Sequence, residues 1–273
     1  MKALEQIDRW PVPTAAVSVV TRDGVLARRG PGERELRWTS VTKLLTAWAV
    51  LVAAEEGVLD LDEPAGPPGA TVRHLLAQAS GLPFEGEQPI AKPGERRIYS
   101  NAGFDALGAL LARRGEMAFD EYLRLAVLMP LGLARTRLRG RPSQGLHGPL
   151  EDLAAFAREL LRPTLVARET LAEATEVAFP GLAGVLPGIG RQEPNDWGLD
   201  FELKDAKSPH WTGSRNSPRT FGHFGGSGTF LWVDPEAGTA LACLAEREFG
   251  AWALEAWPKL SDAVLDELGR RNI

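Results

Sequence analysis

The sequence predicts an α+β fold, with an antiparallel sheet built from both ends of the chain. Strand-like alternation of apolar residues occurs before residue 38 and again after residue 196. Helical periodicity fills the middle, and strands and helices do not alternate as they would in a parallel sheet. We therefore expect one two-lobed domain over residues 1–273. Its sheet lobe would cover about 1–38 plus 196–273, and its helical lobe about 39–195.

The N-terminal elements are expected to be a short helix and a strand meander. The helix covers 3–10 and ends at two prolines. Strands are expected over 15–21, 25–29 and 33–38, separated by turns containing Asp-Gly and Gly-Pro-Gly. A long apolar helix would follow from Ser40 to Glu56, where Gly57 supplies a stop signal.

The middle of the chain reads as helices separated by two irregular stretches. We expect helices over 72–79, 102–114, 118–127, 150–161 and 167–177. The glycine- and proline-rich stretches 82–97 and 179–195 are expected to be loops that border a cleft, because long loops inside compact domains are commonly functional. Strands return over 197–203, 220–223, 229–233 and 239–245, and a helix lies within 252–268. A helix is thus expected near each end of the chain.

Composition excludes several classes of function. The chain has 273 residues, is 44% hydrophobic and carries a net charge of −5, and its charges are spread without a basic stripe that would bind nucleic acid or an anionic membrane. The N-terminus has no apolar segment of the secretory kind, and the longest apolar run, 44–54, is too short to span a bilayer. These features predict a cytoplasmic protein. The single cysteine, Cys243, cannot form an internal disulfide and is expected to be buried.

Ser40 and Lys43 stand three residues apart at the start of the long apolar helix. Residues at this spacing share one helix face, so the hydroxyl and the amine can meet. A serine becomes a good nucleophile when a neighbouring base takes its proton, and a lysine in an apolar setting can lose its charge and act as that base. The alternative is a serine that caps the helix beside a lysine that extends to solvent.

Two further motifs lie at places where loops meet regular structure. Tyr99-Ser100-Asn101 ends the loop 82–97 and begins a helix, and His223-Phe224-Gly225-Gly226 lies between a strand and a glycine-rich turn. Taken singly, Tyr99 could be a core aromatic, Asn101 a helix cap and His223 a packed strand residue. Glycines at the strand end would let backbone approach a ligand closely.

In order and position, the three motifs resemble those of the serine β-lactamase and penicillin-binding-protein superfamily. The Tyr-x-Asn motif looks like the class C branch, which also contains esterases, D-aminopeptidases and D-alanyl-D-alanine carboxypeptidases. The stretch L-L-A-Q-A-S-G-L-P at 75–83 is similar to the family's L-L-x-H-x-S-G-L-P. The resemblance implies a β-lactamase/transpeptidase-like fold, in which N- and C-terminal helices flank the antiparallel sheet and the site lies between the sheet and the helical lobe.

The resemblance also implies a role for each motif residue. Ser40 would be acylated, and Lys43 would be its hydrogen-bonded partner. Tyr99 would shuttle protons either as a phenolate or through Lys43, with its pKa lowered from about 10 by that ammonium. Asn101 would hold Lys43 and the substrate, and the backbone N–H groups of Ser40 and Gly226 would form the oxyanion hole beside Gly225 and His223. No metal or organic cofactor is needed.

We therefore expect a serine hydrolase that acts on a small ester or amide. The third motif begins with His223 rather than the lysine usual in true β-lactamases, and histidine is less reliably charged at neutral pH. A β-lactamase or D-alanyl-D-alanine carboxypeptidase is the alternative within the enzyme class, and a non-catalytic ligand-binding homologue is the alternative outside it. The G-G-S-G-T stretch at 225–229 misses G-x-S-x-G at its last position, and no histidine pair has zinc-ligand spacing.

Overall fold

The computed structural model describes residues 1–271, and its centre is a six-stranded antiparallel sheet with the strand order β2-β1-β11-β10-β9-β8. The strands are β1 (Ala15–Thr21), β2 (Gly24–Arg29), β8 (Glu202–Leu203), β9 (Phe221–Gly225), β10 (Thr229–Asp234) and β11 (Thr239–Ala245). Residues from both ends of the chain meet in the middle of this sheet, since β1 pairs with β11 along its whole length, from Ala15 opposite Ala245 to Thr21 opposite Thr239. This confirms the predicted sheet.

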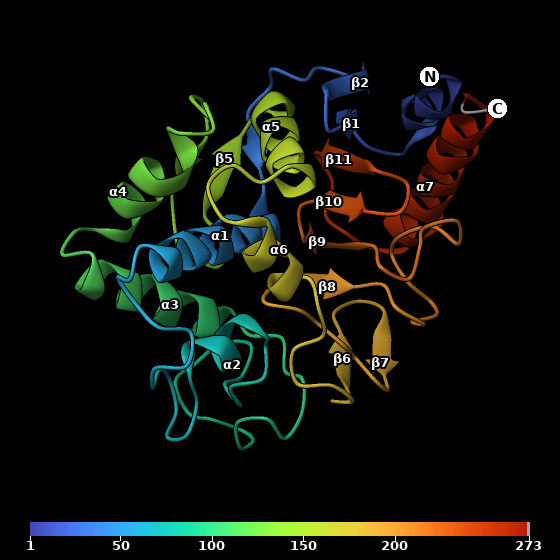
Figure 1. The fold of residues 1–273 in the computed structure, drawn as a ribbon. Coiled ribbons are helices and arrows are strands. Elements are labelled where there is room, and N and C mark those ends of the chain that lie inside the picture. The colour runs from blue at the N-terminus through green and yellow to red at the C-terminus, as the bar shows by residue number, and fades with distance from the viewer. Residues whose placement is uncertain (272–273) are drawn as a thin grey trace.

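Helices cover both faces of the sheet, as Figure 1 shows: α5 (Leu150–Leu161) lies on one face, and η1 (Lys2–Arg9) and α7 (Ala251–Arg271) lie on the other. The apolar residues of the central strands divide between two cores with period two. Val17 and Val19 pack with the terminal helices, whereas Ala16 and Val20 belong to the core that contains α1 (Thr42–Glu55). Alternation along the strand therefore fixes which side chains face the helical region.

The remaining helices gather around α1 on one side of the sheet (Figure 1). They are η2 (Thr39–Val41), α2 (Val72–Leu76), α3 (Asn101–Arg114), α4 (Phe119–Leu123), η3 (Arg124–Leu128) and α6 (Arg168–Ala174). Every residue of α1 from Thr42 to Ala53 is buried, which is the expected state of a helix that is apolar on all sides. Among residues 1–271 no helix is both long and apolar enough to cross a bilayer.

Three sequence predictions about strands were wrong. The stretch 33–38 contains only β3 (Leu36–Arg37), which pairs with β5 (Leu146–Gly148) and not with β2, and β5 also pairs with β4 (Arg137–Leu138). The stretch 197–203 forms a strand only at β8, with isolated β-bridges at Trp197, because Asp200 has a φ of 75° and turns the chain. The expected loop 179–195 contains a hairpin of β6 (Gly184–Leu186) and β7 (Gly190–Gln192).

Candidate active site

Ser40 lies in the single turn η2, directly before α1, at a strained point of the backbone. The preceding residue, Thr39, has a φ of 43°, which is a costly conformation for a β-branched residue. The turn between β9 and β10 holds it there, because the backbone N–H of Ser227 donates to Thr39 Oγ1 at 3.2 Å. The packing of two distant segments therefore determines how Ser40 is presented.

Lys43 is fully buried, and its amine has two hydrogen-bond partners. Nζ donates to Asn101 Oδ1 at 2.6 Å and to the backbone carbonyl of Ser143 at 2.9 Å. A neutral amine has two N–H donors and one lone pair, so these two acceptors use both donors. The lone pair remains available for a proton from a third group, which suits a general base.

Burial lowers the pKa of Lys43 from 10.5 to about 7, against the opposing effects of Asp200, Asp105 and Glu85. Both protonation states are therefore populated near neutral pH. Asn101 is held by its own second contact, because its Nδ2 donates to Glu85 Oε1 at 2.9 Å and its Oδ1 consequently faces Lys43. The predicted pairing of Lys43 with Asn101 is thus present.

Tyr99 is positioned by the cap of the following helix. Ser100 Oγ accepts from the N–H of Gly103 at 2.9 Å, and the ring of Tyr99 lies with its centroid 4.8 Å from Lys43 Nζ. The phenol oxygen is buried and has no hydrogen-bond partner of good geometry among the described residues. Burial raises the pKa of Tyr99 above its ordinary value, although the nearby Ser40 side chain lowers it in part. The expectation that the neighbouring ammonium would lower this pKa was wrong, since desolvation is the largest influence on it and the phenol is neutral.

His223 is buried in β9 between Tyr99 and Trp197, with ring centroids 5.6 Å from each. Its Nδ1 donates to the carbonyl of Phe224 at 2.7 Å, so Nε2 carries the lone pair, and Nε2 has no partner among the described residues. Burial, together with the charge of Lys43, lowers the pKa of His223 to about 3. The imidazole is therefore neutral and cannot provide the positive charge that a lysine would bring to this position.

Gly225 is a glycine because two backbone segments meet there. A Cβ on Gly225 would lie 2.2 Å from Thr39 Oγ1, 2.5 Å from the Trp38 carbonyl and 3.2 Å from the Ser40 nitrogen. No side chain fits into that space. At Gly226, by contrast, a Cβ would meet nothing within 4 Å, because this residue borders open space.

That open space is a cavity of about 190 Å³. It brings together four of the predicted site residues, Ser40, Tyr99, His223 and Gly226. The other lining residues are Phe84, Leu186, Pro187, Gly188, Trp197, Glu202, Phe224 and Phe249. Lys43, Asn101 and Gly225 lie behind this surface. A larger surface hollow of about 520 Å³ beside β2 and α5 contains none of the predicted residues.

Asp200 is a buried acid that the sequence did not single out. It is 0% exposed, and neither carboxyl oxygen has a hydrogen-bond partner among the described residues. Burial raises the pKa of Asp200 well above its usual value, and the charge of Lys43 opposes that shift. No spacing or motif marks this residue, since its burial follows from the turn at its positive φ and from the packing of Phe201 against Trp48 of α1.

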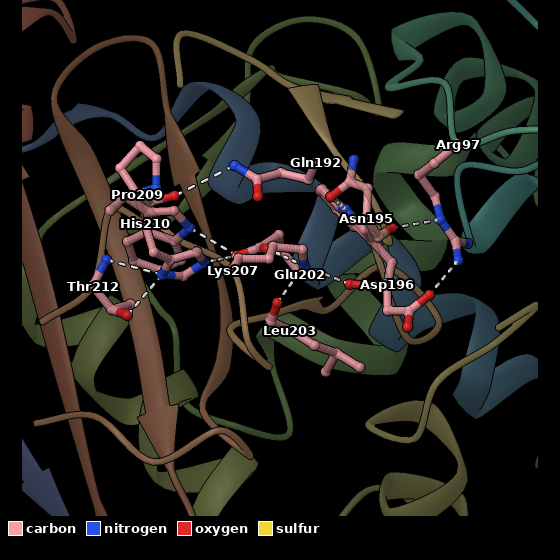
Figure 2. Close-up of polar contacts among 12 residues, drawn as sticks. Arg97, Gln192, Asn195, Asp196, Glu202, Leu203, Lys207, Pro209, His210 and Thr212 are labelled. Atoms are coloured by element: carbon pink, nitrogen blue, oxygen red, sulfur yellow. Dashed lines mark hydrogen bonds and ion pairs between the residues drawn. The ribbon is translucent and has the colours of Figure 1, made fainter. Parts of the chain in front are cut away.

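A second group of buried charges surrounds Glu202, which is one of the residues that line the cavity (Figure 2). The carboxylate of Glu202 accepts from Lys207 Nζ at 2.6 Å and from Trp211 Nε1 at 2.8 Å, and it contacts His210 Nε2 at 2.7 Å. Burial raises the pKa of Glu202, but His210 and Lys207 outweigh it and bring the pKa to about 2. Lys207 also donates to the carbonyl of Asp196 at 2.6 Å. Glu202 is thus ionised and fully paired.

Metal ligands are not gathered anywhere in residues 1–271: no group of three or more His, Cys, Asp or Glu side chains there could hold an ion. Cys243 is buried in β11, as expected, and burial raises the pKa of its thiol above the ordinary value.

Comparison with known proteins decides the family. A model of the Beta-lactamase family matches residues 8–265, which is nearly the whole chain. The chain belongs to the Beta-lactamase family. A solved structure described as a beta-lactamase from Mycobacterium bovis is 55% identical, with a TM-score of 0.96, and the match covers 97% of this chain and 99% of that one. The predicted superfamily and fold are confirmed.

More distant relatives of this Beta-lactamase family member share its fold. Unliganded simvastatin synthase (LovD) from Aspergillus terreus is 18% identical over 97% of both chains, with a TM-score of 0.79. EstCE1, a hydrolase with promiscuous acyltransferase activity, is 17% identical over 97% of both chains, with a TM-score of 0.80. Penicillin-binding protein 4* of Bacillus subtilis is 25% identical over 135 residues, which cover 37% of this chain but only 30% of that protein. The match therefore spans about a third of this curated relative.

Proposed function

We propose that the protein is a serine hydrolase that forms an acyl-enzyme on Ser40 and hydrolyses a small ester or amide. The observation that carries the proposal is the state of Lys43. Its amine is buried, is neutral in part near pH 7 and has both N–H donors engaged, which leaves one lone pair free to accept a proton. The cavity lined by Ser40, Tyr99, His223 and Gly226 supplies the space for a substrate.

In the acylation step, Ser40 Oγ bonds to the substrate carbonyl carbon while its proton passes to Lys43 Nζ. The backbone N–H groups of Ser40 and Gly226 would stabilise the negative charge that develops on the carbonyl oxygen. The bond to the leaving alkoxide or amine then breaks, and that group takes a proton through the neutral phenol of Tyr99, which is replenished from Lys43. In the second half-reaction, water bonds to the carbonyl carbon of the ester while its proton passes to Lys43. The bond to Ser40 Oγ then breaks, Lys43 returns the proton to Ser40 Oγ, and the carboxylic acid is released.

Active-site labelling tests the nucleophile. We expect brief treatment with a fluorophosphonate to add one phosphonyl group, which intact-protein mass spectrometry and peptide mapping place on Ser40. The Ser40→Ala variant is the control and should stay unlabelled while remaining folded by circular dichroism. Labelling elsewhere in the folded protein, or hydrolysis of 4-nitrophenyl acetate by Ser40→Ala at the wild-type rate, would contradict the proposal.

A β-lactamase or D-alanyl-D-alanine peptidase activity is the second candidate. The observation in its favour is the 55% identity to the protein described as a beta-lactamase. This activity requires that a penicillin form a penicilloyl adduct on Ser40 under the same conditions. A folded protein that reacts with neither reagent would favour the non-catalytic, ligand-binding homologue instead.

A further inference from the structure

The cavity beside Ser40 has walls of a particular chemistry. Seven of its twelve lining residues carry aromatic rings or apolar side chains, namely Phe84, Tyr99, Leu186, Pro187, Trp197, Phe224 and Phe249. The turn of the β6–β7 hairpin closes one side. A Cβ on Gly188 would lie only 2.5 Å from Phe249 Cε1, so this turn packs directly against the Phe249 ring. Phe249 in turn stacks near Phe224, with centroids 4.6 Å apart.

The cavity also lacks a cation that could pair with a charged substrate. Among the lining residues the only ionised side chain is Glu202, and its oxygens are already engaged by Lys207, Trp211 and His210 (Figure 2). His223 is buried and neutral, with Nδ1 bound to a carbonyl. Lys43 is not part of the wall, and its two N–H donors are used inside the protein. A carboxylate placed here would lose its hydration and meet a second carboxylate.

The size of the cavity sets an upper limit on the group that fits. Its volume is about 190 Å³, whereas an apolar protein cavity of roughly 150 Å³ is enough to bind benzene. We infer that the cavity holds the acyl group of the substrate, and that this group is uncharged, apolar and no larger than about one six-membered ring. The inference rests on the proposed acylation of Ser40. The acyl side is assigned because the acyl group stays bonded to Ser40, which lines the cavity, after the leaving group has departed.

A set of esters with one leaving group tests the charge preference. We would compare the kcat/KM values of 4-nitrophenyl 4-methylbenzoate and of the mono-4-nitrophenyl ester of terephthalic acid, which differ by a methyl group against a carboxylate at the same position. We expect the charged ester to react at least about 100-fold more slowly, because its carboxylate is desolvated without a partner. Values within about threefold of each other would overturn the inference.

Chain length tests the size limit. The kcat/KM for 4-nitrophenyl esters should be highest from acetate to butyrate or benzoate and fall at least tenfold for decanoate. Phe249→Ala should move the optimum to longer chains, and Phe249→Leu is the milder variant should the first not fold. Val185→Ala is the matched control, since Val185 lies in β6 but is 59% exposed and outside the cavity. An optimum that Phe249→Ala does not move would overturn the inference.

The same measurements separate this inference from the proposed function. If no ester acylates Ser40, the proposed function fails and the inference fails with it. If all of them acylate Ser40 at similar rates, the proposed function stands and the acyl-pocket inference alone is overturned. A series of acetate esters with different leaving groups completes the test. If kcat/KM depends strongly on the leaving group and not on the acyl group, the leaving group and not the acyl group occupies the cavity.

Discussion

At the scale of single residues, Lys43 is expected to set the pH dependence of acylation. Its pKa of about 7 is depressed, and only the neutral amine can accept the proton of Ser40. The acylation rate should therefore fall as pH decreases through about 7. Stopped-flow measurement of the 4-nitrophenoxide burst between pH 5 and 9 checks this, and a flat profile would contradict it. Lys43→Ala should lose roughly 10²- to 10⁴-fold in rate above pH 7 and less below it, where the wild-type amine is itself protonated.

Asp200 is expected to weaken the fold at neutral pH. Its folded-state pKa is raised above the unfolded value of 3.8, so between these two pKa values the unfolded chain has lost a proton that the folded protein keeps. The free energy of unfolding then falls as pH rises above about 4. Asp200→Asn removes this dependence and tolerates the φ of 75°, so it should be more stable than wild type at pH 7 and similar at pH 4.

Urea unfolding at pH 4 and pH 7 measures that difference. Asp205→Asn is the matched control, since Asp205 also has a positive φ of 44° but is only partly buried. It should change stability little at either pH. A loss of stability in Asp200→Asn at pH 7 would mean that the ionised carboxylate stabilises Lys43 in the folded protein, which is the opposite of the expectation.

At the scale of elements, the contact between β9 and the η2 turn is expected to control activity. Gly225→Ala would place a Cβ 2.5 Å from the Trp38 carbonyl and force the turn that carries Ser40 to move. We expect about 1–3 kcal/mol of destabilisation from overpacking and a loss of at least about 100-fold in kcat/KM. Gly32→Ala is the control, because its Cβ would meet no atom closer than 3.7 Å. Normal activity in Gly225→Ala would show that the close contact is dispensable.

Prediction from sequence succeeded for elements whose pattern is local. The period-two alternation of β1 and β11 and the apolar run of α1 are set by residues within each segment, and the structure has them where expected. Prediction failed where a distant pairing partner or a single dihedral angle determines the structure. β3 is so short that its sequence pattern does not identify β5 as its pairing partner, and the positive φ of Asp200 shortened β8.

The candidate site was likewise predictable where it depends on local motifs and not where it depends on distant contacts or burial. The placement of Ser40, Tyr99, His223 and Gly226 around one cavity agrees with the motif-based prediction, although their catalytic roles stay predictions. The pKa of Tyr99 could not be predicted, because it depends on how deeply the hydroxyl is buried. The backbone carbonyl of Ser143 that accepts from Lys43 carries no sequence signal at all, since every residue has such a group.

At the scale of the whole molecule, buried polar groups connect the segment before α3 with the segments on either side of β8. Figure 2 shows Arg97, two residues before Tyr99, donating to the carbonyl of Asn195 at 3.0 Å, while Lys207 is bonded to Asp196 and Glu202. These contacts join the stretch before α3 to the segment that enters β8. The division of the chain into two lobes stays a prediction. Any movement of one lobe relative to the other would have to break these hydrogen bonds or move the bonded segments together.

The ion pair of Glu202 and Lys207 should therefore add little to the free energy of unfolding, whereas removing one partner alone should lower that free energy strongly. Lys207→Met leaves an ionised carboxylate buried, with only His210 and Trp211 as partners, and should destabilise the protein by about 3–5 kcal/mol. The double variant Glu202→Gln/Lys207→Met removes the charge as well and should recover most of that loss. Urea unfolding of the wild type, both single variants and the double variant forms a double-mutant cycle. Equal losses in Lys207→Met and in the double variant would show that packing of the lysine stem, and not its charge, stabilises the segment that lines the cavity.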